Sequence, residues 1–237
     1  MLRVLQSPDE NAKARAELDR RGLSLARSDW LAQLGRRLGI DRYSIGDARK
    51  SWDVLMTAQL IEQRLPKDAA IVDFGAFHSE ITGILCRMGF TSLTGIDLNP
   101  KLKSGPYPDK IRYAIRDFLD TGFPDASFDC ITSISAIEHG HSVDALLKEV
   151  SRLLKPGGLL VGSTDYWPKK IDTTGVMIFG MDWTIFSAEE MAAFFEKARA
   201  AGLQPTGTLE YDATTPSIDF SGRRYSFAWF ALEKRPA

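Results

Sequence analysis

The spacing of hydrophobic positions changes near residue 66 and divides the chain into two parts. Before that point apolar residues recur at helical spacing, so we expect helices over residues 8–22, 29–39 and 51–65. Pro8 suits a first helical turn and Ser28 an N-cap, while Gly22 and Gly39 stand where helices end. The first 65 residues are therefore predicted to be helical.

After residue 66, short β-rich runs alternate with amphipathic stretches. Strands are expected over residues 70–75, 92–100, 111–118, 127–140 and 159–166, and helices over 79–89, 143–158 and 187–202, followed by the β-like runs 204–211 and 225–235. This alternation predicts an α/β fold with a doubly wound, mostly parallel sheet covered on both faces. A ligand is then expected at the carboxyl ends of the strands.

Composition narrows the function classes. The chain has 237 residues with a net charge of -1, which argues against a nucleic-acid partner held by counterion release. It contains no run of 18 apolar residues and no signal-peptide pattern at its start, so we expect a cytoplasmic protein with no membrane span. Two isolated cysteines and three histidines without ligand spacing favour neither a disulfide framework nor a metal site.

Candidate chemistry falls at the ends of four predicted strands. Asp73 and Gly75 end the first, where glycine permits a sharp turn and close backbone approach to a ligand. The helix expected to begin near His78 presents unpaired N–H groups suited to a carboxylate. Asp97 ends the second strand and can accept two ribose hydroxyls. Asp117 and Phe118 end the third and suit a purine edge, and SAIEHG ends the fourth.

In this order, these residues resemble class I, Rossmann-like S-adenosylmethionine-dependent methyltransferases. VDFGAFHSE matches part of the family's first motif, GIDLNP matches the acidic second, and LLKEVSRLLKPGG resembles the helix and turn before strand five. The resemblance covers roughly residues 53–235 and implies a seven-stranded sheet whose last strand is antiparallel. Only Gly75 remains of the family's three-glycine turn, with Phe77 and Ser79 in place of the others.

The resemblance implies S-adenosylmethionine as the cofactor. Residues expected to bind it, by correspondence with the family's motifs, are Asp73, Gly75, Phe77, His78, Asp97, Leu98, Asp117, Phe118 and Ile137. Methyl transfer from a sulfonium can be achieved largely by alignment, with a base needed when the acceptor is a hydroxyl. His139 is the first candidate for a base and His141 the second, although the Glu-His pair is often structural in this family.

Substrate contacts are expected from the parts that vary within the family. One is a helical N-terminal cap, residues 1–52, which precedes a methyltransferase domain over residues 53–237. The other is an aromatic-rich insert over residues 165–187 that is predicted to form a lid. The expected substrate residues are Tyr43, Trp52, Tyr166, Trp167, Phe179 and Trp183. An equally weighted alternative is that these aromatics only pack the insert onto the domain.

The hypothesis is methyl transfer to an O- or N-nucleophile of a small organic acceptor, such as a sugar or natural-product intermediate. The alternative is a methyltransferase-like binding or regulatory domain that has lost catalysis. A nicotinamide oxidoreductase is disfavoured because GAFHSE lacks the later glycines of its fingerprint. RNA or protein methylation is disfavoured because the chain has no basic stripe and no NPPY-like tetrapeptide. Homodimerisation is left open.

Overall fold

A computed structural model describes residues 1–26 and 45–235 of the chain. The helix predicted over residues 29–39 and the candidate Tyr43 lie outside the described residues. The elements in chain order are β1 (Leu2–Val4), α1 (Pro8–Arg20), η1 (Ala48–Lys50), α3 (Ser51–Arg64), β2 (Ala70–Phe74), α4 (Ile81–Arg87), β3 (Ser92–Asp97), η2 (Pro100–Ser104), β4 (Ile111–Ile115), β5 (Phe128–Ile134), α5 (Val143–Leu153), β6 (Leu154–Tyr166), β7 (Met177–Ile178), β8 (Met181–Asp182), α6 (Ala188–Ala200), β9 (Leu203–Pro205), β10 (Ile218–Phe220) and β11 (Arg223–Lys234).

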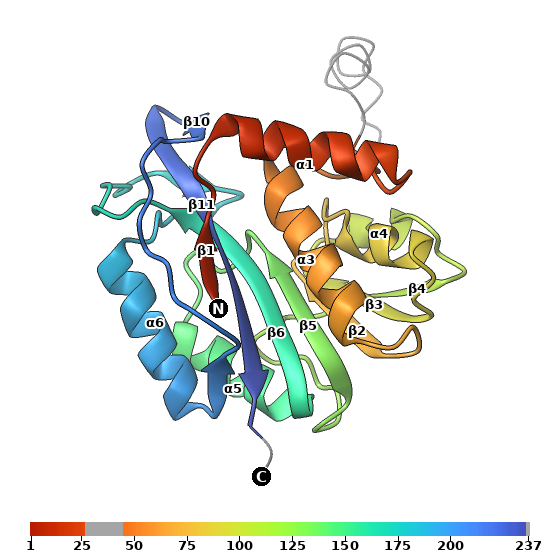
Figure 1. The fold of residues 1–237 in the computed structure, drawn as a ribbon. Helices are drawn as coiled ribbons and strands as arrows, with labels where there is room; N and C mark the ends of the chain where they lie inside the picture. Colours follow the sequence, from red (N-terminus) through yellow and green to blue (C-terminus); the bar gives the residue numbers. More distant parts are fainter. Residues whose placement is uncertain (27–44, 236–237) are drawn as a thin grey trace.

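The central sheet has the strand order β1-β11-β6-β5-β2-β3-β4 (Figure 1). The pairs β6–β5, β5–β2, β2–β3 and β3–β4 are parallel, whereas β11 runs antiparallel to β6. The short strands β9 and β10 also pair with β11. The structure thus confirms the predicted doubly wound, mostly parallel α/β sheet with a seven-strand path and an antiparallel last strand.

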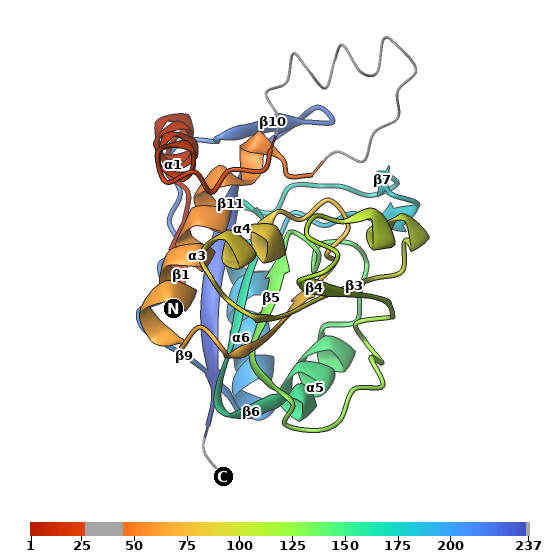
Figure 2. The same ribbon diagram turned by 90° about the vertical axis from the view of Figure 1, so that its right-hand side faces the viewer.

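Helices cover both faces of the sheet, with α3 and α4 on one and α5 and α6 on the other (Figures 1 and 2). Successive side chains of a strand point to opposite faces. Accordingly, Ile71 packs with the cluster under α3 and α4, while its neighbour Val72 packs with the cluster that includes α5 and α6. Trp229 and Phe230 of β11 divide in the same way. The sheet is therefore buried on both faces, which explains the near-continuous apolar runs of its strands.

The prediction that the first 65 residues are helical was wrong at the chain start. Leu2–Val4 forms strand β1, which pairs with β11 in the register Leu2↔Phe230. A strand of three residues is too short to show an alternation of apolar and polar positions, and its pairing partner lies at the far end of the sequence. The local sequence pattern therefore could not predict β1. The two described helices follow prediction more closely: Ser7 caps α1, Pro8 occupies its first turn, and α3 begins at Ser51.

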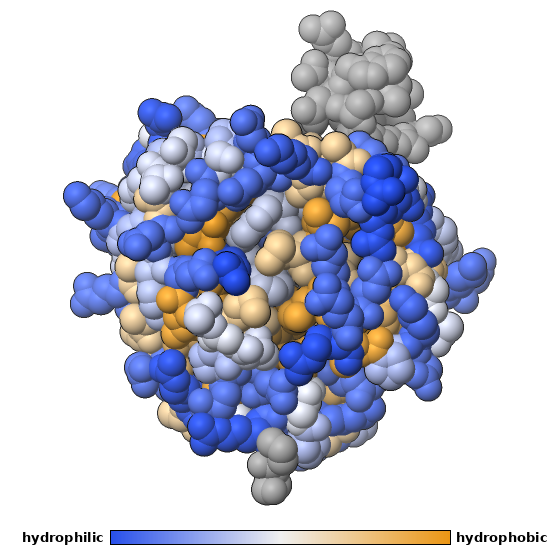
Figure 3. Space-filling model, viewed as in Figure 1, coloured by the Kyte–Doolittle hydropathy of each residue, from blue (hydrophilic) through white to orange (hydrophobic). Residues whose placement is uncertain are grey.

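The face of the molecule seen in Figure 3 is mostly hydrophilic, with smaller hydrophobic areas between the polar side chains. Within residues 1–26 and 45–235, no helix is long and apolar enough to cross a membrane.

Candidate functional site at the carboxyl edge of the sheet

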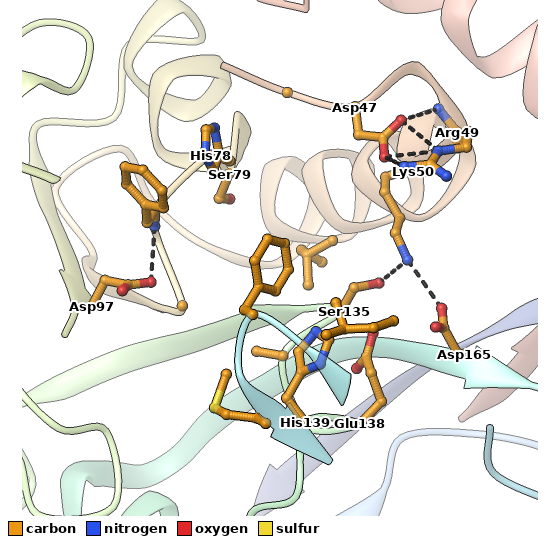
Figure 4. Close-up of a pocket in the computed structure, with 18 of the residues that line it drawn as sticks. Asp47, Arg49, Lys50, His78, Ser79, Asp97, Ser135, Glu138, His139 and Asp165 are labelled. Carbon is orange, nitrogen blue, oxygen red and sulfur yellow. Dashed lines mark hydrogen bonds and ion pairs between the residues drawn. The ribbon is translucent and has the colours of Figure 1, made fainter. Parts of the chain in front are cut away.

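A cavity of about 640 Å³ lies where β2, β3, β5 and β6 end, which is the edge predicted to bind a ligand. Its volume is within the range of small-molecule and cofactor pockets. Among the cavity-lining side chains drawn in Figure 4, Asp97 and His78 lie on one side and Lys50 and Asp165 on the other. We call these the turn side, lined by Gly75, Phe77, His78, Asp97, Leu98 and Phe118, and the lysine side, lined by Lys50, Ser135, Glu138, His139, Asp165, Ile178, Phe179, Met181, Ile218, Phe220, Tyr225 and Phe227.

The turn after β2 folds back onto the end of β3. The backbone N–H groups of Gly75 and Ala76 both donate to the carbonyl of Ile96, at 3.1 and 3.0 Å. Gly75 has φ +73°, and a Cβ placed there would lie 2.9 Å from the Cβ of Ala136. Both residues line the cavity, so a side chain at position 75 would be strained and would crowd this wall. This explains why a single glycine is retained where the family pattern has three.

Asp97 connects the two strand ends on the turn side. Its Oδ2 accepts a hydrogen bond from the backbone N–H of Phe77 at 3.2 Å, and its Oδ1 accepts from that of Asn99 at 2.8 Å. Leu98, beside it, has 64% of its surface exposed. Phe118 closes this side, stacked on Phe74 with ring centroids 5.6 Å apart. A carboxylate beside apolar surface suits a ligand with hydroxyls next to a flat ring.

Three predicted cofactor residues are not among those that line the cavity. Asp73 is buried beneath the turn, where its Oδ1 accepts from the Thr132 hydroxyl at 2.7 Å. Burial raises the pKa of Asp73 to about 7, although hydrogen bonds from Thr132 and Ser79 oppose the shift. Asp117 is exposed and accepts from the backbone N–H of Leu119. Ile137 packs into the core between Ala136 and Glu138.

The helix expected to begin near His78 begins instead at Ile81, so the first-turn N–H groups are displaced from the predicted place. The buried carboxylate of Glu80 precedes it. Arg15 pairs with this carboxylate at 2.7 Å, and the backbone N–H groups of Leu25 and Ala26 donate to it at 3.0 Å. An acidic group therefore already lies at this helix start, tying the N-terminal segment to the rim of the cavity.

Lys50 is the central polar group of the lysine side. It reaches from η1 toward the ends of β5 and β6, where its Nζ donates to the Ser135 hydroxyl and to Asp165 Oδ1, the latter at 3.2 Å (Figure 4). The same Nζ lies 3.6 Å from the centroid of the Phe227 ring. Burial lowers the pKa of Lys50, but the carboxylates of Asp165, Glu138 and Asp53 outweigh it, and the net pKa is raised. The lysine is therefore a buried, ion-paired cation.

Two further carboxyl groups lie around this lysine. Glu138 lines the cavity although it is almost fully buried; burial and the neighbouring Asp165 raise its pKa to about 8, against the opposing effect of Lys50. Asp53 lies in α3 and accepts from the Ser163 hydroxyl at 2.7 Å. Burial raises its pKa to about 6. Of these two carboxyl groups, Glu138 lines the cavity, whereas Asp53 lies behind the wall in α3.

Both candidate histidines line the cavity. His139 packs edge-on against Phe179, with ring centroids 5.6 Å apart, and its buried Nδ1 has no hydrogen-bond partner in the described part of the chain. His141 packs against Phe118 at 4.5 Å. Burial lowers the pKa of each imidazole, against the opposing effect of Asp165 on His139 and of Asp117 on His141.

Of the predicted substrate residues that the structure describes, Phe179 is the one that lines the cavity. It lies at the tip of the β7–β8 hairpin with 80% of its surface exposed. Tyr166 and Trp183 are buried, and the Trp183 indole N–H donates to Asp165 Oδ2 at 2.7 Å. Trp52 and Trp167 pack against the cluster around Trp183. Most of the insert's aromatics therefore build its core, and the hairpin tip supplies the surface over the cavity.

Sequence reasoning named no role for Lys50, Ser135, Asp165 or Tyr225, and it considered Glu138 only as the partner of His139 in a Glu-His pair. The rule that selected Asp73 and Asp97, a carboxylate at the end of a predicted strand, also applies to Asp165 and would have found it. Glu138 lies beside His139 in the segment that was singled out. Lys50 and Tyr225 lack any local signal, since they reach the cavity only through tertiary contacts. No cluster of potential metal ligands occurs among the residues that the structure describes.

Comparison with known proteins points in one direction. Residues 72–162 match a family model described as a methyltransferase domain. The 2-methyl-6-phytyl-1,4-hydroquinone methyltransferase of Synechocystis is 26% identical over 168 residues, which cover 65% of this chain and 52% of that protein. The chain thus spans about half the length of this curated relative.

Solved structures share the fold. The 1,6-didemethyltoxoflavin-N1-methyltransferase of Burkholderia thailandensis superposes with a TM-score of 0.56 at 17% identity, covering 98% of this chain and 92% of that one. The geranyl diphosphate C-methyltransferase of Streptomyces coelicolor A3(2) gives 0.58 at 17% identity, covering 76% and 78%. The family match thus shows a methyltransferase domain over residues 72–162, and the solved structures show that the chain shares the Rossmann-like fold of S-adenosylmethionine-dependent methyltransferases.

Proposed function

We propose that the protein transfers the methyl group of S-adenosylmethionine to a small organic acceptor bound on the lysine side of the cavity. The observation that carries this proposal is one continuous cavity, in which the turn side suits a nucleoside and the lysine side is a separate polar and aromatic surface. The methyltransferase names of the relatives support the reaction class. In the proposed division into a cap, residues 1–52, and a domain, residues 53–237, the cap contributes Lys50 to that wall and strand β1 to the central sheet.

The residues on the turn side fit the cofactor. Gly75 leaves open a wall that a Cβ would fill against Ala136. Asp97 presents carboxylate oxygens that can accept from ribose hydroxyls, while Leu98 and Phe118 offer apolar surface to an adenine. We propose that these residues hold the nucleoside and that His78 contacts the methionine part. When bound, the cofactor supplies an electrophilic sulfonium methyl group.

The chain's own contribution is binding, alignment and exclusion of water. The lysine side would hold the acceptor with its nucleophile toward the cofactor, and such alignment supplies much of the rate acceleration in a transfer between two bound molecules. The β7–β8 hairpin would cover the acceptor, with Phe179 over His139. Buried carboxyl groups with pKa values near neutrality would accept a proton where the nucleophile carries one.

Titration calorimetry with S-adenosylmethionine and S-adenosylhomocysteine tests the proposal. We expect low- to mid-micromolar dissociation constants, that is about 6–8 kcal/mol of binding free energy. A folded sample freed of carried-over ligand that binds neither compound would contradict the proposal. That result would favour the alternative, a binding or regulatory domain that has lost catalysis.

A further inference from the structure

We infer that Glu138 accepts the proton of a phenolic acceptor bound on the lysine side, and that Lys50 is the positioning residue that holds the charges around it. The inference rests on the proposed function and names the acceptor class. It concerns the part of the cavity whose residues Lys50, Asp165 and Tyr225 lie outside the matched segment 72–162. Glu138 itself lies inside that segment and lines the same wall.

Lys50 and Asp165 satisfy one another and are poorly placed to hold a substrate. The ammonium has Ser135 and Asp165 as hydrogen-bond acceptors and the ring of Phe227 beside it. The second oxygen of Asp165 accepts the indole N–H of Trp183. Removing one member of such a buried pair leaves an uncompensated charge, so each fixes the other in place.

Glu138 differs because no ion pair within 4.0 Å restrains it among the residues described. Its carboxyl meets neutral hydroxyls, from Thr164 at 3.4 Å and from Ser135. The charged or titratable groups that face it are Asp165 from β6, Lys50 from η1 and Tyr225 from β11. With its pKa raised to about 8 by burial, this carboxyl can take up and release a proton near neutral pH.

His139 is the competing proton acceptor in the same wall. Burial lowers its pKa, so its affinity for a proton is weaker than that of Glu138 at any pH. Its ring is also held against Phe179 at the hairpin tip. Glu138 is therefore the stronger base of the two.

The chemistry of the wall selects the acceptor class. A phenol ionises near pH 10, as tyrosine does, about two units above Glu138, whereas water ionises near 15.7. Transfer of a phenolic proton to Glu138 is thus unfavourable by only about two pKa units, that is about 100-fold, whereas transfer from an aliphatic hydroxyl, which ionises near the value for water, is unfavourable by several units more. The remaining lining is apolar or aromatic and matches a ring-shaped body: Ile178, Phe179, Met181, Ile218, Phe220, Tyr225 and Phe227.

The step balances in atoms and electrons. The phenolic oxygen forms a bond to the methyl carbon while the bond from that carbon to the sulfonium sulfur breaks and its electron pair stays on sulfur. The hydroxyl proton passes to the Glu138 carboxylate. The products are a methyl ether, S-adenosylhomocysteine and a protonated Glu138.

The first test needs no turnover. Carboxyl signals of protein labelled with ¹³C-glutamate are followed by NMR from pH 5 to 10. We expect one glutamate to titrate near pH 8, to be missing in Glu138→Gln, and to titrate at higher pH in Lys50→Met, which removes a cation that favours the carboxylate. Exposed Lys13→Met and Glu189→Gln serve as matched controls and should leave that signal unchanged. A wild-type protein in which no glutamate titrates above pH 6 would overturn the inference.

The second test uses 4-propylphenol, 4-propylaniline and propylbenzene, which share a body and differ in the reacting group. Methylation of the phenol is expected, with kcat/KM rising with pH toward a plateau above pH 8. Glu138→Gln should lower kcat/KM by about 100-fold or more. Lys50→Met should move the rise in kcat/KM to higher pH. Methylation of the aniline alone, or of none of the three by protein that binds S-adenosylhomocysteine, would overturn the phenol assignment. Failure to bind S-adenosylhomocysteine would instead overturn the proposed function.

Discussion

Asp97 Oδ2 lies 3.2 Å from the backbone nitrogen of Phe77, so the end of β3 holds the turn that follows β2. We predict that Asp97→Ala weakens S-adenosylmethionine binding by about 10-fold or more, since it removes acceptors for the ribose and releases the turn. Calorimetry measures the change, with the exposed Asp109→Ala as the control. Equal affinities of the two variants for S-adenosylmethionine would show that the cofactor does not bind at the turn side of the cavity.

Gly75→Ala separates backbone strain from crowding of the cavity. Gly75 and Gly157 both have positive φ, +73° and +78°, but only a Cβ at position 75 meets another residue within 4 Å. We expect each alanine variant to lose about 1 kcal/mol of unfolding free energy, while only Gly75→Ala loses cofactor affinity. Denaturant unfolding and calorimetry check the two effects; parallel losses of affinity in both variants would contradict this assignment.

Three buried carboxyl groups predict how stability depends on pH. The pKa values of Asp53, Asp73 and Glu138 are raised to about 6, 7 and 8, because burial disfavours their charged forms. A raised folded-state pKa gives stability that is complete below the unfolded value and is lost as pH rises through the folded one. Melting temperature should therefore fall between about pH 5 and 8, and Glu138→Gln should flatten the upper part of that fall. A wild-type melting temperature that rises over this range would contradict the prediction.

Arg15→Met tests the ion pair that holds the N-terminal segment to the rim of the cavity. The Glu80 carboxylate is buried, and its partner Arg15 is mostly so, with a separation of 2.7 Å. Removing the arginine should cost about 3 kcal/mol of unfolding free energy, because Glu80 keeps its charge without its cation. Arg20→Met, on the exposed face of the same helix, is the control and should not differ measurably from wild type. Chemical denaturation compares the variants.

The sheet was predictable because its signals are local. The apolar runs of its strands, the glycines that follow α1, α4 and α6, and the carboxylates near the strand ends are all visible within a few residues. The turn side of the cavity, built around Gly75 and Asp97, was predictable for the same reason. The end of α5 was predicted too late, because the Lys-Pro-Gly-Gly segment lies in β6 and not at the helix end. On the lysine side only His139 and Phe179 were predicted, because the rest is assembled from distant segments and its ion pair joins residues 50 and 165. Trp183 shows the limit most clearly, since its hydrophobicity fitted a lid and a core equally well.

Strand β1 also affects the stage of synthesis at which the central sheet can finish folding. Residue 2 pairs with residue 230, so β1 emerges from the ribosome more than 200 residues before the strand that binds it. Contacts of such sequence separation form late in folding. The parallel strands β2 to β6 can assemble first, while the N-terminal segment with Lys50 waits for Tyr225 and Phe227 of β11. We therefore expect the lysine side of the cavity to be the last part of the protein to form.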